Sequence, residues 1–165
     1  MLTVDPKLRA KLGRIKLTLL SRLWVLRNQR TISNYFAPFH FENIKPYKLE
    51  TWHFGSRYFT ANYQGSGQRV FIKTASLGAL IAREVRAIEH LQMGSNSKHF
   101  PSILAYHYTD AAYPFLAIEF LDAPQLEPDA PYTKEEKRTL MTQLISILEA
   151  LHKNKLIHRD ILLRN

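Results

Sequence analysis

The chain has 165 residues, 45% of them hydrophobic, with no cysteine and a formal net charge of +9. This length and apolar content fit one globular domain, or one lobe of a larger fold, and are too small for two large domains. The lack of cysteine excludes disulfide frameworks, thiolate metal sites and cysteine nucleophiles. A cytoplasmic location is compatible with this composition.

Most of the positive charge lies in the first thirty residues, where eight lysines and arginines stand against Asp5 alone, which gives +7 of the +9. Apolar residues recur there at spacings of three and four, which predicts a basic amphipathic helix over residues 1–30. The residues of this predicted apolar face are Leu8, Leu12, Ile15, Leu19, Leu23 and Leu26.

Two interpretations of this helix remain open. In the first, it lies on an anionic membrane surface, where each lysine or arginine near the headgroups contributes about 1 kcal/mol. In the second, its apolar face docks on its own domain and its charges are solvated. The longest apolar run, 17–26, contains Arg22 and is too short to span a bilayer. Nucleic-acid binding is a third possibility, but the sequence contains no base-reading motif, and we expect no nucleic-acid partner.

The following elements are predicted in chain order. Residues 31–46 are aromatic and interrupted by proline, which indicates a connector with little regular structure. The stretches "SRYFTANYQ" and "QRVFIKTA" flank "GSG" and predict a β-hairpin. A helix is predicted in "LGALIAREVRAIEHLQM", followed by a strand, a loop and a strand in "SILAYHYTDAAYPFLAIEFL".

The segment 122–132, "DAPQLEPDAPY", holds three prolines and separates the strand-rich part from a helical part. Immediately after it, Thr133 and Glu136 have the spacing of a capping box, which predicts a helix from Thr133 to about Lys153. This helix leads into "HRDILLRN", residues 158–165.

The last eight residues resemble the protein-kinase catalytic loop, H-R-D-x-x-x-x-N, at every fixed position. Because the preceding elements also follow the kinase order, the resemblance to the protein-kinase-like superfamily covers about Tyr47 to Asn165. It implies an α+β fold, with a kinase-like N-lobe at 47–121, a hinge or linker at 122–132, and the start of a C-lobe at 133–165. The bound cofactors implied are ATP and Mg²⁺.

The resemblance also assigns catalytic roles to individual residues. Asp160 would be the carboxylate that accepts or orients the proton of the substrate hydroxyl, and Asn165 would be a ligand of Mg²⁺. "VFIK" is similar to the V-A-I-K strand, which makes Lys73 the residue that contacts the α and β phosphates. Its expected partner on the next helix is Glu84, with Glu89 as the competing candidate.

The nucleotide-binding residues are also identified by resemblance. Gly55 would belong to the loop that covers the phosphates, although kinases have G-x-G-x-x-G where this chain has one glycine. The strand "FLAIEFL" is similar to the one that leads into the kinase hinge. Ile118 would then guard the back of the adenine pocket, and the Glu119 carbonyl and Leu121 amide would bond adenine.

The function implied is ATP-dependent transfer of the γ-phosphate to a hydroxyl group, on a protein or on a lipopolysaccharide core sugar. Leu162 and Leu163 in the catalytic loop, the reduced glycine loop and the basic N-terminal helix resemble bacterial kinases of lipopolysaccharide core sugars. These features imply a peripheral location on the inner face of the membrane. Because no D-F-G follows Asn165, the alternative is a truncated or pseudokinase-like chain without activity, with at most a binding or membrane-associated role.

Overall fold

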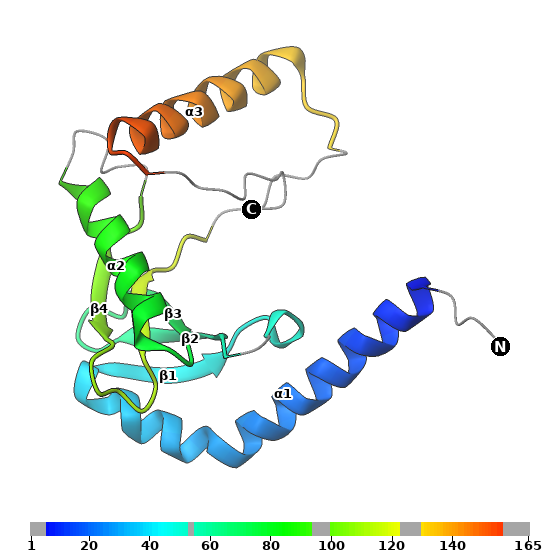
Figure 1. Cartoon of the computed structure of the whole chain (residues 1–165), viewed down its shortest axis with the longest axis vertical. Helices are drawn as coiled ribbons and strands as arrows, with labels where there is room; N and C mark the ends of the chain where they lie inside the picture. The colour runs from blue at the N-terminus through cyan, green and yellow to red at the C-terminus, as the bar shows by residue number, and fades with distance from the viewer. Residues whose placement is uncertain (1–5, 53–54, 94–99, 123–129, 157–165) are drawn as a thin grey trace. The chain divides into compact units, whose positions relative to one another are not determined.

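A computed structural model describes residues 6–52, 55–93, 100–122 and 130–156, without the side chains of 6–11 and 14. The chain forms two compact units, one of residues 1–84 and 103–120 and the other of 85–102 and 121–165. The first unit contains a long helix and an antiparallel sheet, and the second contains the last described helix (Figure 1). The predicted α+β fold is confirmed.

Five antiparallel strands form one sheet in the order β1-β2-β3-β5-β4. Their bounds are Phe41–Pro46 for β1, Arg57–Tyr63 for β2, Arg69–Thr74 for β3, Ile103–His107 for β4 and Phe115–Glu119 for β5. Strands β2 and β3 are the predicted hairpin, and its turn uses Gly65 and Gly67 at φ 90° and 67°. Both angles lie in the left-handed region that glycine adopts without steric cost.

Alternate residues of the central strands point to opposite faces of the sheet. On one face, six buried side chains form a core with Ile32 and Phe36 of the N-terminal helix. These six are Phe59, Ala61, Val70, Ile72, Phe115 and Ala117. The other face carries the intervening residues of the same strands, among them Lys73. The sheet thus has a helix-covered face and a second face, which we call the Lys73 face.

Phe115 is the centre of the core on the helix-covered face. Its ring is 0% exposed and lies 4.7 Å from Phe39 and 5.1 Å from Phe36, measured between ring centroids. Tyr35 and Phe41 pack at 6.3 and 6.2 Å. All four contacts are edge-on, which is the geometry that favours attraction between aromatic quadrupoles.

The N-terminal helix is longer than the sequence predicts. Helix α1 spans Pro6–Phe36, a 3-10 turn (η1) follows at Ala37–Phe39, and β1 begins at Phe41. The prediction of a connector with little regular structure at 31–46 is therefore wrong. Ile32 and Phe36 are buried against the sheet, and this packing extends the helix up to the residue before Ala37-Pro38, where proline prevents continuation.

The predicted apolar face of α1 is also not the one that docks on the domain. The side chain of Leu8 lies outside the described residues, and the other five residues of the predicted face are exposed: Leu12, Ile15, Leu19, Leu23 and Leu26. The sheet is instead contacted by residues on the other side of the helix, including Trp24, whose ring stacks under the Arg57 guanidinium at 4.0 Å and meets Trp52 edge-on at 5.9 Å. Burial lowers the pKa of Arg57 from its ordinary value.

Helices α2 and α3 follow the sequence pattern closely. Helix α2 spans Gly78–Gln92 and α3 spans Lys134–Lys153. The predicted capping box is present, since Thr133 Oγ1 accepts from the Glu136 amide and Glu136 accepts from the Thr133 amide. This bond from the Thr133 backbone, with a second from the Thr133 hydroxyl, holds the pKa of Glu136 below its ordinary value.

Candidate functional site: a lysine and glutamate pair on the sheet

Lys73 forms an ion pair with Glu84 on the Lys73 face of the sheet. The lysine is the fifth residue of β3, and its Nζ donates a hydrogen bond to Glu84 Oε1. The two side chains are 28% and 39% exposed, so the pair is reachable from solvent without being fully hydrated. The structure therefore brings together the two residues that the sequence singles out as partners.

The choice of Glu84 over Glu89 follows from helix geometry. Ile81 and Val85 of α2 are 0% and 1% exposed, and their burial fixes the rotation of the helix about its axis. Glu89 lies five residues after Glu84, which places it about 140° around the axis and about 7.5 Å further along it. The Glu89 side chain therefore does not point in the direction in which Glu84 reaches Lys73.

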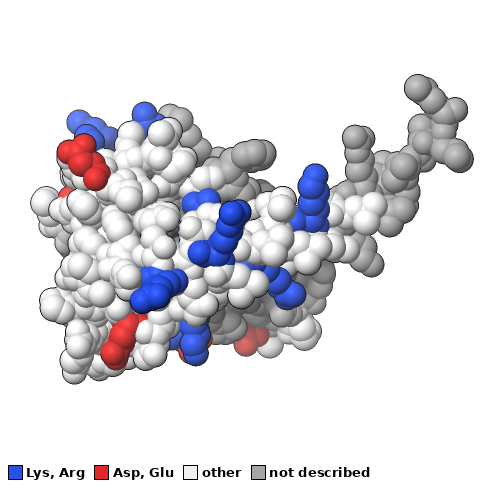
Figure 2. Space-filling model, turned by 90° about the horizontal axis from the view of Figure 1, so that it is seen from below, with Lys and Arg blue, Asp and Glu red and all other residues white. Residues whose placement is uncertain are grey.

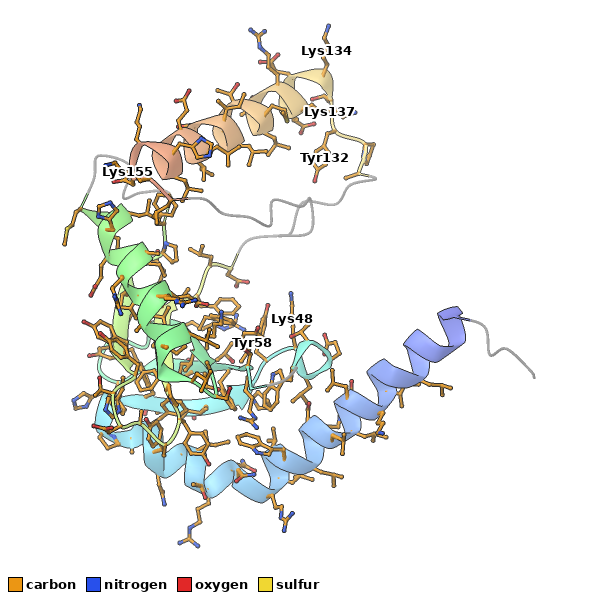
Figure 3. The ribbon with its side chains drawn as sticks, viewed as in Figure 1. Lys48, Tyr58, Tyr132, Lys134, Lys137 and Lys155 are labelled. Atoms are coloured by element: carbon orange, nitrogen blue, oxygen red, sulfur yellow. The ribbon has the colours of Figure 1, made fainter. Side chains whose placement is uncertain are left out.

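Aromatic side chains lie beside Lys73 on the same face of the sheet, and sequence reasoning did not identify them as part of the site. Tyr58 of β2 (labelled in Figure 3) is opposite Lys73 in the strand register, and Phe71 precedes Lys73 by two positions on the same face. The Tyr58 and Phe71 rings are stacked at 5.8 Å, and Tyr47 meets both Phe71 and Phe120 edge-on at 5.8 Å. The presence of Tyr58 in "RYFTANY" and Phe71 in "RVFIK", the two strands of the predicted hairpin, was the signal available for this cluster.

Phe71 also marks a departure from the motif that pointed to Lys73. V-A-I-K has alanine where this chain has Phe71, so a ring stands in the position of a methyl group. The Lys73 face is consequently more aromatic beside the ion pair than the motif alone indicates.

Gly55 lies close to the end of β3 that carries Lys73. Its φ is 85°, and a Cβ added there would collide with the side chain of Ser76, three residues after Lys73. A larger residue at Gly55 would therefore be strained both by backbone conformation and by lack of space. The structure places Gly55, the predicted phosphate-covering residue, beside Ser76, just beyond the end of β3.

The three predicted adenine contacts differ in their positions. Ile118 is on β5, directly opposite Phe71 in the register, and so lies on the Lys73 face. Glu119 is the last residue of β5 and pairs with Val70, and the next amide, that of Phe120, donates to the Arg69 carbonyl. Leu121 follows the strand, in the other compact unit, with a side chain that is 64% exposed.

Asp160 and Asn165 lie outside the described residues, as do the other residues of "HRDILLRN". Within the part of the chain that is described, no group of three or more His, Asp or Glu side chains is placed to hold a metal ion. Among the described residues, the ammonium group of Lys73 has the charge that suits the phosphates of a nucleotide. Asn165, the residue implied as a ligand of Mg²⁺, lies outside the described residues.

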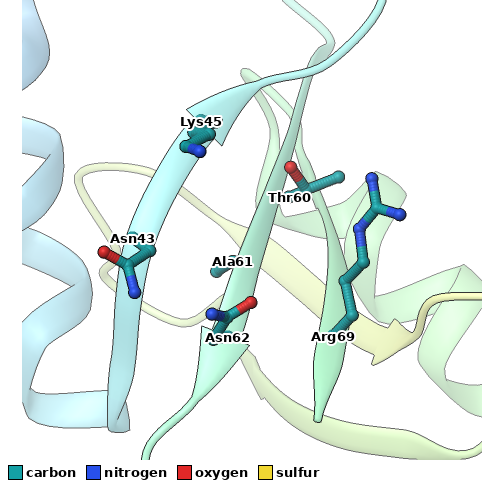
Figure 4. Close-up of a pocket in the computed structure, with 6 residues that line it drawn as sticks. All are labelled: Asn43, Lys45, Thr60, Ala61, Asn62 and Arg69. Atoms are coloured by element: carbon teal, nitrogen blue, oxygen red, sulfur yellow. The ribbon is translucent and has the colours of Figure 1, made fainter. Parts of the chain in front are cut away.

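A polar groove of about 490 Å³ lies over strands β1, β2 and β3 (Figure 4). Two cations line it, Lys45 of β1 and Arg69 of β3, together with Asn43, Thr60, Ala61 and Asn62. Strand alternation puts Arg69 on the same face as Phe71 and Lys73, at the opposite end of β3. The Lys73 face therefore carries a basic side chain at both ends of this strand, with Lys73 paired to Glu84.

No protein-family model matches the chain. Over 88 residues, 53% of this chain, it is 27% identical to serine/threonine-protein kinase D of Synechocystis sp., of which the match covers 17%. It is also similar to serine/threonine-protein kinase PLK4 of Drosophila grimshawi, with 31% identity over 88 residues. This match covers 48% of this chain and 11% of the relative. With the protein of the same name in Drosophila virilis, the identity is 27% over 63% of this chain and 14% of the relative.

These partial similarities support a kinase-like relationship. The matches extend over 48% to 63% of this chain and over less than a fifth of each relative, so they reach only a fraction of the length of the kinases concerned. The sheet order and the Lys73–Glu84 pair are consistent with a fragment similar to a kinase N-lobe.

Proposed function

We propose that this chain is the nucleotide-binding part of an ATP-dependent phosphotransferase that transfers the γ-phosphate of ATP to a hydroxyl group. The observation that carries the proposal is the ion pair between Lys73 and Glu84 on a five-stranded antiparallel sheet. The kinase similarities support the same class of activity.

Lys73 holds the α and β phosphates in this proposal. Its ammonium group supplies a positive charge with three donors on a flexible stem, and the Glu84 carboxylate fixes the direction of that stem. Because phosphoryl transfer depends mainly on placement and on neutralisation of charge, an oriented cation at the phosphates is a large part of the catalysis. Gly55 lets the backbone approach the phosphates closely.

The other roles in the proposal belong to residues named by the catalytic-loop motif and the hinge strand. Asp160 accepts or orients the proton of the attacking hydroxyl, and Asn165 would hold Mg²⁺, which when bound neutralises charge on the phosphates. Ile118 would line the back of the adenine pocket. The Glu119 carbonyl and the Leu121 amide would supply the polar contacts to the base.

The acceptor is proposed to be a hydroxyl of a protein or of a lipopolysaccharide core sugar. The leucines at 162 and 163 and the basic helix α1 favour the glycolipid acceptor. They support our proposal of a cytoplasmic protein that lies peripherally on the inner face of the membrane. None of the described helices is long and apolar enough to cross a membrane. The similarity to serine/threonine-protein kinases favours a protein acceptor. Transfer of labelled γ-phosphate to protein or to core oligosaccharide distinguishes these acceptors.

Calorimetric titration with ATP and Mg²⁺ tests the nucleotide site directly. Glu84→Gln is expected to weaken ATP binding by about 10-fold, because a charge-assisted hydrogen bond that orients Lys73 is reduced to a neutral one. The matched control is Glu89→Gln on the same helix, which removes the same charge and is expected to leave the affinity unchanged.

Two results would count against the proposal. An equal loss of affinity in Glu84→Gln and Glu89→Gln would mean that net charge, rather than the ion pair, governs binding. Failure of the wild-type protein to bind ATP at all would favour the alternative, a pseudokinase-like chain without activity.

A further inference from the structure

Helix α1 has two apolar faces, and only one of them is used by the fold. The face on the sheet is formed by residues that are buried or half-buried: Ser21, Trp24, Val25, Asn28, Ile32, Tyr35 and Phe36. Since successive residues are rotated by about 100°, these residues cluster around one direction of the helix axis. This face accounts for the attachment of α1 to the domain.

The second face is a stripe of five large apolar residues that are between 49% and 73% exposed. We call it the leucine stripe; it consists of Leu12, Ile15, Leu19, Leu23 and Leu26. Its centre lies about 160° around the axis from the centre of the buried face, and from Leu12 to Leu26 it is about 21 Å long. Docking of α1 on the sheet therefore leaves the stripe pointing away from the sheet.

The charge on α1 has a single sign. The helix contains eight lysines and arginines and no aspartate or glutamate. Among the described side chains, Arg22 lies on one side of the leucine stripe, and Lys16 and Arg27 lie on the other side. Each is about 60–80° around the helix axis from the centre of the stripe, and all three are exposed. Figure 2 views the molecule from the side on which α1 lies, and Lys and Arg side chains are interspersed there with uncharged surface.

The leucine stripe is exposed, apolar and bordered on both sides by cations, so its binding partner should combine an apolar region with negative charge. A second copy of the chain would bring two sets of like charges together along the rims of the stripe, which is unfavourable. A surface of anionic lipid headgroups neutralises the rims while its acyl boundary receives the leucines. We infer that α1 docks on two partners at once, the sheet through its Trp24 face and an anionic membrane surface through the leucine stripe.

This inference names the part of α1 that would meet the membrane, and it depends on the geometry of α1 rather than on the phosphotransferase activity. Vesicle binding and ATP binding are separate measurements, so one can fail while the other holds. In this arrangement the axis of α1 lies parallel to the membrane plane, with its sheet on the side away from the lipid.

Co-sedimentation with vesicles made of equal parts phosphatidylcholine and phosphatidylglycerol tests the inference. The variant Leu19→Glu with Leu23→Glu is expected to lower the partition coefficient by at least about 10-fold, because both leucines enter the acyl boundary. Both positions are more than half exposed, and circular dichroism should show an unchanged fold. Wild-type binding is expected to weaken with added salt and with pure phosphatidylcholine vesicles.

A matched control makes the same change of charge away from α1. Leu77→Glu with Met93→Glu alters two apolar residues that are 62% and 85% exposed, and it should bind vesicles as the wild type does. Equal binding by the stripe variant and the wild type overturns the inference. So does a lipid-independent dimer that the stripe variant dissociates, because the stripe would then be an interface between copies. Equal loss in the control variant also overturns it, since net charge alone would explain binding.

Discussion

Replacing Lys73 by methionine is expected to lower phosphoryl transfer by about 10²–10³-fold, the usual effect of removing one group that stabilises developing charge. Methionine keeps the length of the stem and removes the ammonium group that Glu84 orients. Both ATP affinity and turnover should fall, because Lys73 contacts the phosphates in the ground state and in the transition state. The measurements are ATP titration and formation of labelled product.

Two further variants serve as controls for this prediction. Lys45→Met removes an exposed cation of β1 from the polar groove and should leave turnover unchanged. Asp160→Asn should retain ATP binding while losing turnover, because a base that acts on the acceptor is not needed to hold the nucleotide. Turnover by Lys73→Met at the wild-type rate would contradict the role assigned to the ion pair.

Phe115→Ala is expected to lower the free energy of unfolding by about 3–5 kcal/mol. The ring is fully buried and lies in contact with Phe36, Phe39 and Phe41, which come from α1, η1 and β1. Its removal leaves a cavity where the helix meets the sheet. Urea denaturation followed by circular dichroism measures the effect.

A milder variant keeps this prediction testable if the alanine variant does not fold. Phe115→Leu loses only part of the ring volume and should cost about 1–2 kcal/mol. The surface control is Leu26→Ala, at a residue that is 73% exposed, where a change within about 0.5 kcal/mol is expected. Loss of the same free energy in Leu26→Ala and Phe115→Leu would contradict the position of the core.

The elements with strong local signals were predictable from the sequence. Thr133 and Glu136 have the spacing that a capping box requires, and α3 begins immediately after Thr133. The glycines of "GSG" supply the left-handed conformations of the β2–β3 turn. In both cases the interaction that fixes the structure joins residues within a few positions of each other, so the pattern contains it.

Helix α1 shows where local patterns fail. Spacing of three and four identified the leucine stripe as an apolar face, but a second apolar face on the opposite side, with Ile32 and Phe36, is the one that packs. Which face is buried depends on contacts with strands far along the chain, such as β5 at Phe115. The same long-range packing extends the helix through the segment interpreted as a connector.

Only those residues of the candidate site that belong to a sequence motif could be predicted. Lys73 and Glu84 were named from the sequence and lie together in the structure. The aromatic cluster was missed, because Tyr47 and Phe120 are neighbours of Phe71 only through the pairing of strands. Asp160 and Asn165 lie outside the described residues, and their roles stay predictions.

The most direct test of the central claim is to locate the lysine beside the phosphates of bound ATP. An acyl phosphate derivative of ATP transfers its acyl group to an amine at that position, and mass spectrometry identifies the modified residue. We predict that Lys73 is the principal site of acylation and that excess ATP with Mg²⁺ protects it. Acylation spread over exposed lysines such as Lys45, with Lys73 unmodified and no protection by ATP, would contradict a nucleotide site at the Lys73–Glu84 pair.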